Sequence, residues 1–138
     1  MASPGMHVMG LSDSIKILLD DLIIIHPIKI EFHEAGMKEE SMNEKLQLDI
    51  FRIVQEQLNN ILKHSKATHA TINLSKQANE VVLLISDNGQ GCDMSKEKKG
   101  VGIINIKSRA ELHQGRVTIV SRPGEGFKLK VVLREMLE

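Results

Sequence analysis

The sequence is poor in aromatic residues and in cysteine. Its 138 residues contain no Trp, no Tyr and only three Phe. The hydrophobic core must therefore be built from Ile, Leu, Val and Met side chains. The single cysteine, Cys92, excludes an internal disulfide and is typical of a protein from a reducing compartment. We therefore expect a cytoplasmic domain.

Long apolar runs and an excess of either charge are also missing. Runs such as "LIII" at residues 22–25 are far too short to cross a bilayer. Eighteen basic and eighteen acidic residues cancel, so we expect no nucleic-acid groove and no direct membrane contact. With 41% apolar and 26% charged residues, the chain has the composition of a soluble globular domain. We interpret residues 1–9 as a disordered tail or cloning remnant and residues 10–138 as one domain.

Hydrophobic periodicity predicts three helices and five strands. The predicted helices cover residues 11–24, about 43–65 and about 103–114. The predicted strands cover residues 28–32, 69–75, 80–88, 116–121 and 127–133. The order α-β-α-β-β-α-β-β predicts an α+β fold, a two-layer α/β sandwich in which about three helices cover one face of a mixed β-sheet.

The long predicted helix carries a row of polar side chains opposite its apolar side. Glu56, Asn60, Lys63 and His64 are spaced i, i+4, i+7 and i+8, so an α-helix places them on one face. Taken alone, each residue is typical of the solvated side of an amphipathic helix. The row is also a candidate wall for a site that holds a metal and phosphates. Other segments of the chain must decide between these two interpretations.

The motif "DNGQG" at residues 87–91 follows an apolar strand. Asp87 can accept a hydrogen bond from an exocyclic amine. Gly89 and Gly91 let the backbone turn sharply and approach a ligand closely. The same letters are also a common turn, so the motif alone does not establish a site.

The motif "GVGIIN" at residues 100–105 opens the last predicted helix. Gly100 and Gly102 there can expose backbone N–H groups to an anion. A P-loop is excluded because no Gly-Lys-Ser/Thr follows, and Asn105 replaces the third glycine of a dinucleotide fingerprint. The alternatives are a solvated loop and a mobile flap that faces phosphates.

Together, the segments "FRIVQEQLNNILKHSKA", "DNGQG" and "GVGIINIKSRAELHQG" resemble the ATP-binding catalytic domain of bacterial sensor histidine kinases. These domains belong to the GHKL or Bergerat-fold superfamily. The resemblance covers about residues 10–134 and looks strongest toward kinases of the nitrate-sensor and lipid-thermosensor type. It implies the Bergerat ATP-binding fold, the cofactors ATP and Mg²⁺, and a role in two-component signal transduction.

The resemblance also implies a role for individual residues. Glu56 would be the catalytic residue that polarises the attacking group, and Asn60 would be the Mg²⁺ ligand. Two positions depart from the family pattern, because Phe127 stands where Thr is frequent and Cys92 stands where a large apolar residue is frequent. The residues implied to contact ATP are Asn60, Lys63, His64, Asp87, Gly89, Gly91, Gly100 and Gly102.

The resemblance implies that the γ-phosphoryl group of ATP goes to a histidine on a dimerisation domain absent from this chain. The one His-acid pair, His33-Glu34, follows a period of two rather than 3.6, so we do not expect it to be the acceptor. The implied partners are this dimerisation domain of the same protein and a response regulator, within a homodimeric full-length kinase of a kind that can be membrane-anchored. Two alternatives stay open: a serine kinase of the anti-sigma type and a non-catalytic nucleotide-binding module.

Overall fold

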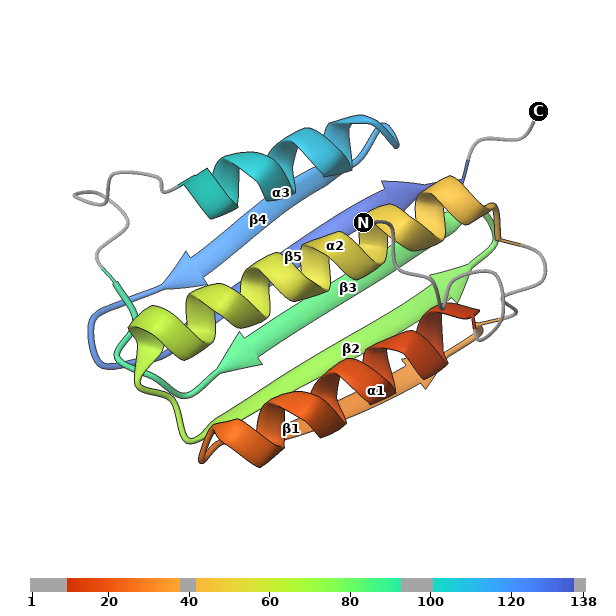
Figure 1. Ribbon diagram of the computed structural model, residues 1–138. Helices are drawn as coiled ribbons and strands as arrows, with labels where there is room; N and C mark the ends of the chain where they lie inside the picture. Colours follow the sequence, from red (N-terminus) through yellow and green to blue (C-terminus); the bar gives the residue numbers. More distant parts are fainter. Residues whose placement is uncertain (1–9, 38–41, 93–100, 136–138) are drawn as a thin grey trace.

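The computed structural model describes residues 10–37, 42–92 and 101–135, in which helices and strands follow the predicted order (Figure 1). The three α-helices are α1 (Gly10–Ile25), α2 (Glu44–Asn60) and α3 (Val101–Glu111). The strands are β1 (Lys29–Ala35), β2 (His69–Gln77), β3 (Glu80–Asp87), β4 (Arg116–Ser121) and β5 (Phe127–Arg134). The predicted tail lies outside the described residues.

The strands form one mixed sheet in the order β1-β2-β3-β5-β4. β1 pairs with β2 in parallel, and the other three pairs are antiparallel. All three helices lie on the same face of the sheet, with α2 between α1 and α3 (Figure 1). The predicted two-layer α/β sandwich with a mixed sheet is therefore confirmed.

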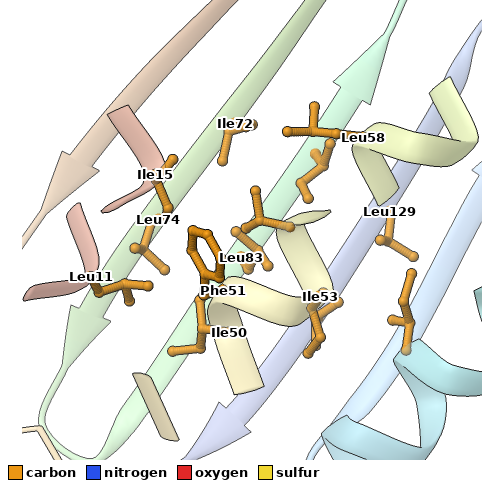
Figure 2. Close-up of a cluster of buried hydrophobic side chains, with 14 of the residues drawn as sticks. Leu11, Ile15, Ile50, Phe51, Ile53, Leu58, Ile72, Leu74, Leu83 and Leu129 are labelled. Carbon is orange, nitrogen blue, oxygen red and sulfur yellow. The ribbon is translucent and has the colours of Figure 1, made fainter. Parts of the chain in front are cut away.

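The core between the two layers is aliphatic, as the composition predicts. Helix α2 begins after Asn43, whose side-chain oxygen accepts a hydrogen bond from the Leu46 N–H at 2.7 Å. Among the three phenylalanines only Phe51 is buried. Figure 2 shows labelled side chains of α1 and α2 gathered over strands β2, β3 and β5. The fully buried side chains there include Leu11, Ile15, Ile50, Ile53, Leu58, Ile72, Leu74, Leu83 and Leu129.

Helix α1 buries apolar side chains on its inner side and also exposes apolar side chains at its C-terminal end. Its inner side buries Leu11 and Ile15, whereas Ile24 and Ile25 are 81% and 75% exposed. Within the described ranges, α1 and the other helices are too short or too polar to span a membrane.

Three elements differ in detail from the prediction. Strand β1 continues to Ala35, so it includes His33 and Glu34, both of which are exposed. Helix α3 begins at Val101, which places Gly102 inside its first turn. The last turn of the long helix, residues 61–65, is π-helical rather than α-helical. Consequently the α-helical spacing that predicts one polar row does not continue through Lys63 and His64.

Candidate functional site

Two polar side chains of α2 face the first turn of α3. A Cβ atom built on Gly102 would lie 2.9 Å from Asn60 Oδ1 and 3.2 Å from Glu56 Oε2, so a side chain at this position would displace the ends of these two side chains. Asn60 Nδ2 donates a hydrogen bond to Gln57 Oε1 at 3.2 Å. Both polar atoms of the Asn60 side chain therefore lie beside the start of α3, with Oδ1 closer than Nδ2, which is 3.2 Å from the same Cβ position. Glu56, Asn60 and Gly102 are thus brought together, although 42 positions separate Asn60 from Gly102 in the chain.

The second predicted segment turns sharply at the end of β3. Asp87 is partly buried, and its Oδ1 accepts a hydrogen bond from the Gly89 N–H at 2.8 Å. Burial raises the pKa of the Asp87 carboxyl, and the Gly89 hydrogen bond opposes that increase in part. Phe127 lies directly opposite Asp87 in the β3–β5 register, so its side chain shares a face of the sheet with the carboxylate.

The "DNGQG" segment is bound to the π-helical turn that ends the long helix. Gln90 donates two hydrogen bonds to this turn: its N–H to the Ser65 carbonyl at 2.7 Å and its Nε2 to the His64 carbonyl at 2.6 Å. Gly89 packs so closely on Ser65 that an added Cβ would lie 2.3 Å from the Ser65 carbonyl oxygen. The absence of a side chain at Gly89 therefore allows the end of β3 to lie directly against the end of the long helix.

The other side of the segment is bound to the loop between β4 and β5. Gly91 has a φ of +63°, and a Cβ there would lie 2.2 Å from the Arg122 carbonyl oxygen. Gly126 donates to the Gly89 carbonyl at 3.1 Å. Figure 1 shows the end of α2, the end of β3 and the start of α3 on the same side of the molecule.

The remaining predicted site residues are less constrained. Lys63 and His64 have exposed side chains on the π-helical turn. Gly100 and most of the predicted flap lie outside the described residues. In the described part of the chain, no three His, Cys, Asp or Glu side chains are grouped to hold a metal ion. The side chains at this site that could contribute oxygen ligands to a metal are Asn60, through its amide oxygen, and Glu56.

Sequence reasoning missed a buried charged cluster between α2 and α3. Asp49 is fully buried, and its Oδ1 accepts a hydrogen bond from Arg109 at 3.1 Å. Its Oδ2 lies 2.6 Å from His113 Nε2, and Lys45 Nζ lies 3.3 Å away. One feature of the sequence could have indicated the cluster: Asp49 is a lone carboxylate beside the apolar residues of the buried side of α2.

Sequence reasoning also missed that Asn105 is a neighbour of the catalytic candidate. Its Nδ2 donates a hydrogen bond to Glu56 Oε1 at 3.3 Å.

An open groove of about 470 Å³ lies between the three helices and reaches Glu56, but neither Asn60 nor Asp87 lines it. The groove is lined by Leu18, Leu22, Arg52, Gln55, Glu56, Leu58, Asn59 and Arg109.

Comparison with known proteins identifies similar sequences among bacterial kinases. The signal transduction histidine-protein kinase/phosphatase DegS of Brevibacillus brevis is 31% identical over 125 residues, which cover 80% of this chain and 32% of DegS. The sensor histidine kinase LiaS of Bacillus subtilis is 32% identical over 123 residues, which cover 88% of this chain and 33% of LiaS. The chain thus spans about a third of the length of these relatives.

A solved structure supports the fold, and a family model identifies the family. The histidine kinase domain of the blue-light activated histidine kinase EL346 from Erythrobacter litoralis superposes with a TM-score of 0.69 at 14% identity. The match covers 89% of this chain and 58% of that one, which establishes the shared fold. Residues 45–136 match the model of the histidine kinase-, DNA gyrase B- and HSP90-like ATPases. The nitrate-sensor and lipid-thermosensor subtype stays a prediction. Because the family model covers most of its length, the chain belongs to the histidine kinase-, DNA gyrase B- and HSP90-like ATPase family.

Proposed function

We propose that this domain binds Mg-ATP and donates the γ-phosphoryl group to a histidine on the dimerisation domain of a two-component sensor kinase. The observation that carries the proposal is the approach of Glu56, Asn60 and Gly102, three predicted site residues from two helices. The relatives described above are named as histidine kinases, which supports the same reaction class.

The chemistry of the site fits the proposed cofactors. Mg²⁺ prefers oxygen ligands, and Asn60 directs its amide oxygen toward the first turn of α3. The N-terminus of an α-helix has N–H groups without partners inside the helix and the positive end of the helix dipole, which favour phosphate oxygens. When bound, Mg²⁺ offsets negative charge on the phosphate oxygens. Because Gly102 has no side chain, the first turn of α3 lies directly beside Asn60.

Asp87 is the residue that we assign to adenine. Its Oδ1 is already bonded to the Gly89 N–H, so Oδ2 remains to accept a hydrogen bond from an exocyclic amine. Guanine presents a carbonyl oxygen at the corresponding position, which an ionised carboxylate repels. We therefore infer a preference for ATP over GTP.

Titration calorimetry with ATP, in the presence and absence of Mg²⁺, tests the binding step. Transfer of labelled γ-phosphate to a separately supplied dimerisation domain tests the reaction. Acid-labile label would support phosphohistidine, and acid-stable label on a protein partner would support the serine-kinase alternative. A chain that binds ATP but transfers no phosphate would favour the non-catalytic alternative.

Three further inferences depend on the histidine reaction. They are a response regulator as downstream partner, a homodimeric full-length kinase and a cytoplasmic site of action.

Replacing Asn60 with alanine is expected to remove the dependence of ATP affinity on Mg²⁺. The variant keeps the helix but loses the one amide oxygen assigned to the metal. Calorimetric titrations of ATP at several Mg²⁺ concentrations measure the effect. Asn59→Ala, on the neighbouring exposed position, is the matched control. An unchanged Mg²⁺ dependence in Asn60→Ala would contradict the ligand role.

Replacing Gly102 with alanine is expected to weaken Mg-ATP binding about tenfold without lowering the thermal stability. Alanine favours a helix over glycine by about 1 kcal/mol, and the atoms that its Cβ meets are ends of side chains that can move. Moving Asn60 and Glu56, however, disturbs the cofactor site. Calorimetry and thermal unfolding of the same sample separate the two effects. Equal ATP affinity in the variant and the wild type would argue against phosphates at this position.

A further inference from the structure

The two oxygens of the Glu56 carboxylate have different surroundings. Oε1 accepts the hydrogen bond from Asn105 Nδ2 at 3.3 Å. Oε2 is the oxygen near Gly102, 3.2 Å from where a Cβ would stand. One oxygen is therefore held by a neighbouring side chain, and the other faces the first turn of α3.

Asn105 can hold this oxygen only if α3 keeps a fixed position along α2. The buried carboxylate of Asp49 provides that constraint, because it binds Arg109 at 3.1 Å and His113 at 2.6 Å. Arg109 follows Asn105 by four residues, and Asp49 precedes Glu56 by seven. Both spacings place their residues on one helix face, so the polar contacts run in a line along the α2–α3 interface.

We propose that Asn105 is a positioning residue for Glu56, holding Oε1 so that Oε2 stays directed toward the reacting groups. The inference rests on the proposed kinase function. In that reaction, one imidazole nitrogen forms a bond to the γ-phosphorus while the bond to the β–γ bridging oxygen breaks. The electron pair of that bond leaves with ADP, and the proton on the other imidazole nitrogen passes to Glu56. A carboxylate held in one orientation accepts that proton more efficiently than a rotating one.

The alternative role, a surface hydrogen bond that only stabilises the fold, predicts a different outcome. Asn105 is exposed and its bond to Glu56 is long, so losing it changes stability by less than a core substitution would. A role in positioning instead lowers turnover while ATP affinity and thermal stability stay near those of the wild type.

The test compares three substitutions at Asn105 with one control. Asn105→Asp keeps the shape of the side chain but replaces the amide donor with a carboxylate that repels Glu56. Asn105→Ala removes the donor, and Asn105→Gln keeps an amide on a longer arm. The control is Ser108→Ala, at an exposed position one turn further along α3. Each variant is measured for phosphotransfer kcat and KM with a supplied dimerisation domain, for Mg-ATP affinity and for thermal unfolding.

We expect kcat to fall about tenfold in Asn105→Ala and further in Asn105→Asp, with partial recovery in Asn105→Gln. Mg-ATP affinity is expected to change less than twofold. A second readout needs no turnover: in the free chain, the Asn105 side-chain amide resonance should shift when Glu56 is replaced by Gln. Wild-type kcat in both Asn105→Ala and Asn105→Asp would overturn this inference alone. Absence of ATP binding and of phosphotransfer in the wild type would overturn the proposed function, and this inference with it.

Discussion

Replacing Asp49 with alanine is expected to lower the free energy of unfolding by about 2–4 kcal/mol, because a buried hydrogen-bond network loses its central acceptor. Asp49 is fully buried and is the shared partner of Arg109 and His113. Without it, His113 stays buried with no carboxylate beside it, and Arg109 loses its contact across the helix interface. Urea unfolding followed by circular dichroism measures the loss.

Lys45→Ala is the matched control for Asp49→Ala. Lys45 contacts the same carboxylate, but its side chain is 63% exposed, so we expect a loss of less than about 1 kcal/mol. A second comparison isolates the buried contact: in the Asp49→Ala background, adding His113→Ala should cost less than His113→Ala costs alone. If Asp49→Ala unfolded at the urea concentration of the wild type, the cluster would not be what holds α3 against α2.

Replacing Asp87 with asparagine is expected to weaken adenine-nucleotide binding by about 1–3 kcal/mol, because a partly buried acceptor that faces an amine is lost. The same variant should unfold at a higher temperature than the wild type at pH 7. Burial raises the pKa of Asp87 in the folded state, so the ionised side chain opposes folding at neutral pH. Asparagine has no charge to desolvate and can still accept the Gly89 hydrogen bond.

The pH dependence follows from the sign of this shift. A raised carboxyl pKa contributes stability that is fully present below the unfolded-state pKa, about 3.9 for Asp, and is lost as the pH rises through the folded-state pKa. The stability advantage of Asp87→Asn should therefore disappear as the pH falls toward 4. Nucleotide affinity of the wild type should fall over the same interval, because the protonated carboxyl is a weaker acceptor. Parallel changes in binding and stability, instead of opposite ones, would contradict the adenine assignment.

The fold could be predicted from the sequence because its elements have clear periods. The strand at residues 80–88 and the long helix have different repeats of apolar residues, and each is bounded by turn residues or a cap. The details that escaped prediction depend on partners distant in the chain. The π-helical turn forms where Ser65 Oγ donates to the Ile61 carbonyl and the Ser65 carbonyl accepts from Gln90, and the second of these contacts has no local pattern.

The candidate site also has one part that local sequence motifs predict and another part that depends on contacts between distant segments. Asp87 and the glycines belong to short motifs that the sequence presents intact. The contacts of Asn105 and Asp49 cross the α2–α3 interface over 49 and 60 or more positions, and periodicity does not specify which side chains meet across an interface. In the sequence Asn105 stands out only as the residue that replaces a glycine, although its amide contacts the carboxylate of Glu56 on α2.

The π-helical turn at residues 61–65 has a consequence for how this family can diversify. A π-helical ring contains one more residue than an α-helical ring, so any gain or loss of a residue there rotates the carbonyl groups that follow. Those carbonyls are the ones that the backbone and side chain of Gln90 bind. We therefore expect the length of the helix end and the length of the glycine-containing turn after β3 to change together. Relatives in which one of the two segments has changed length should carry a compensating change in the other.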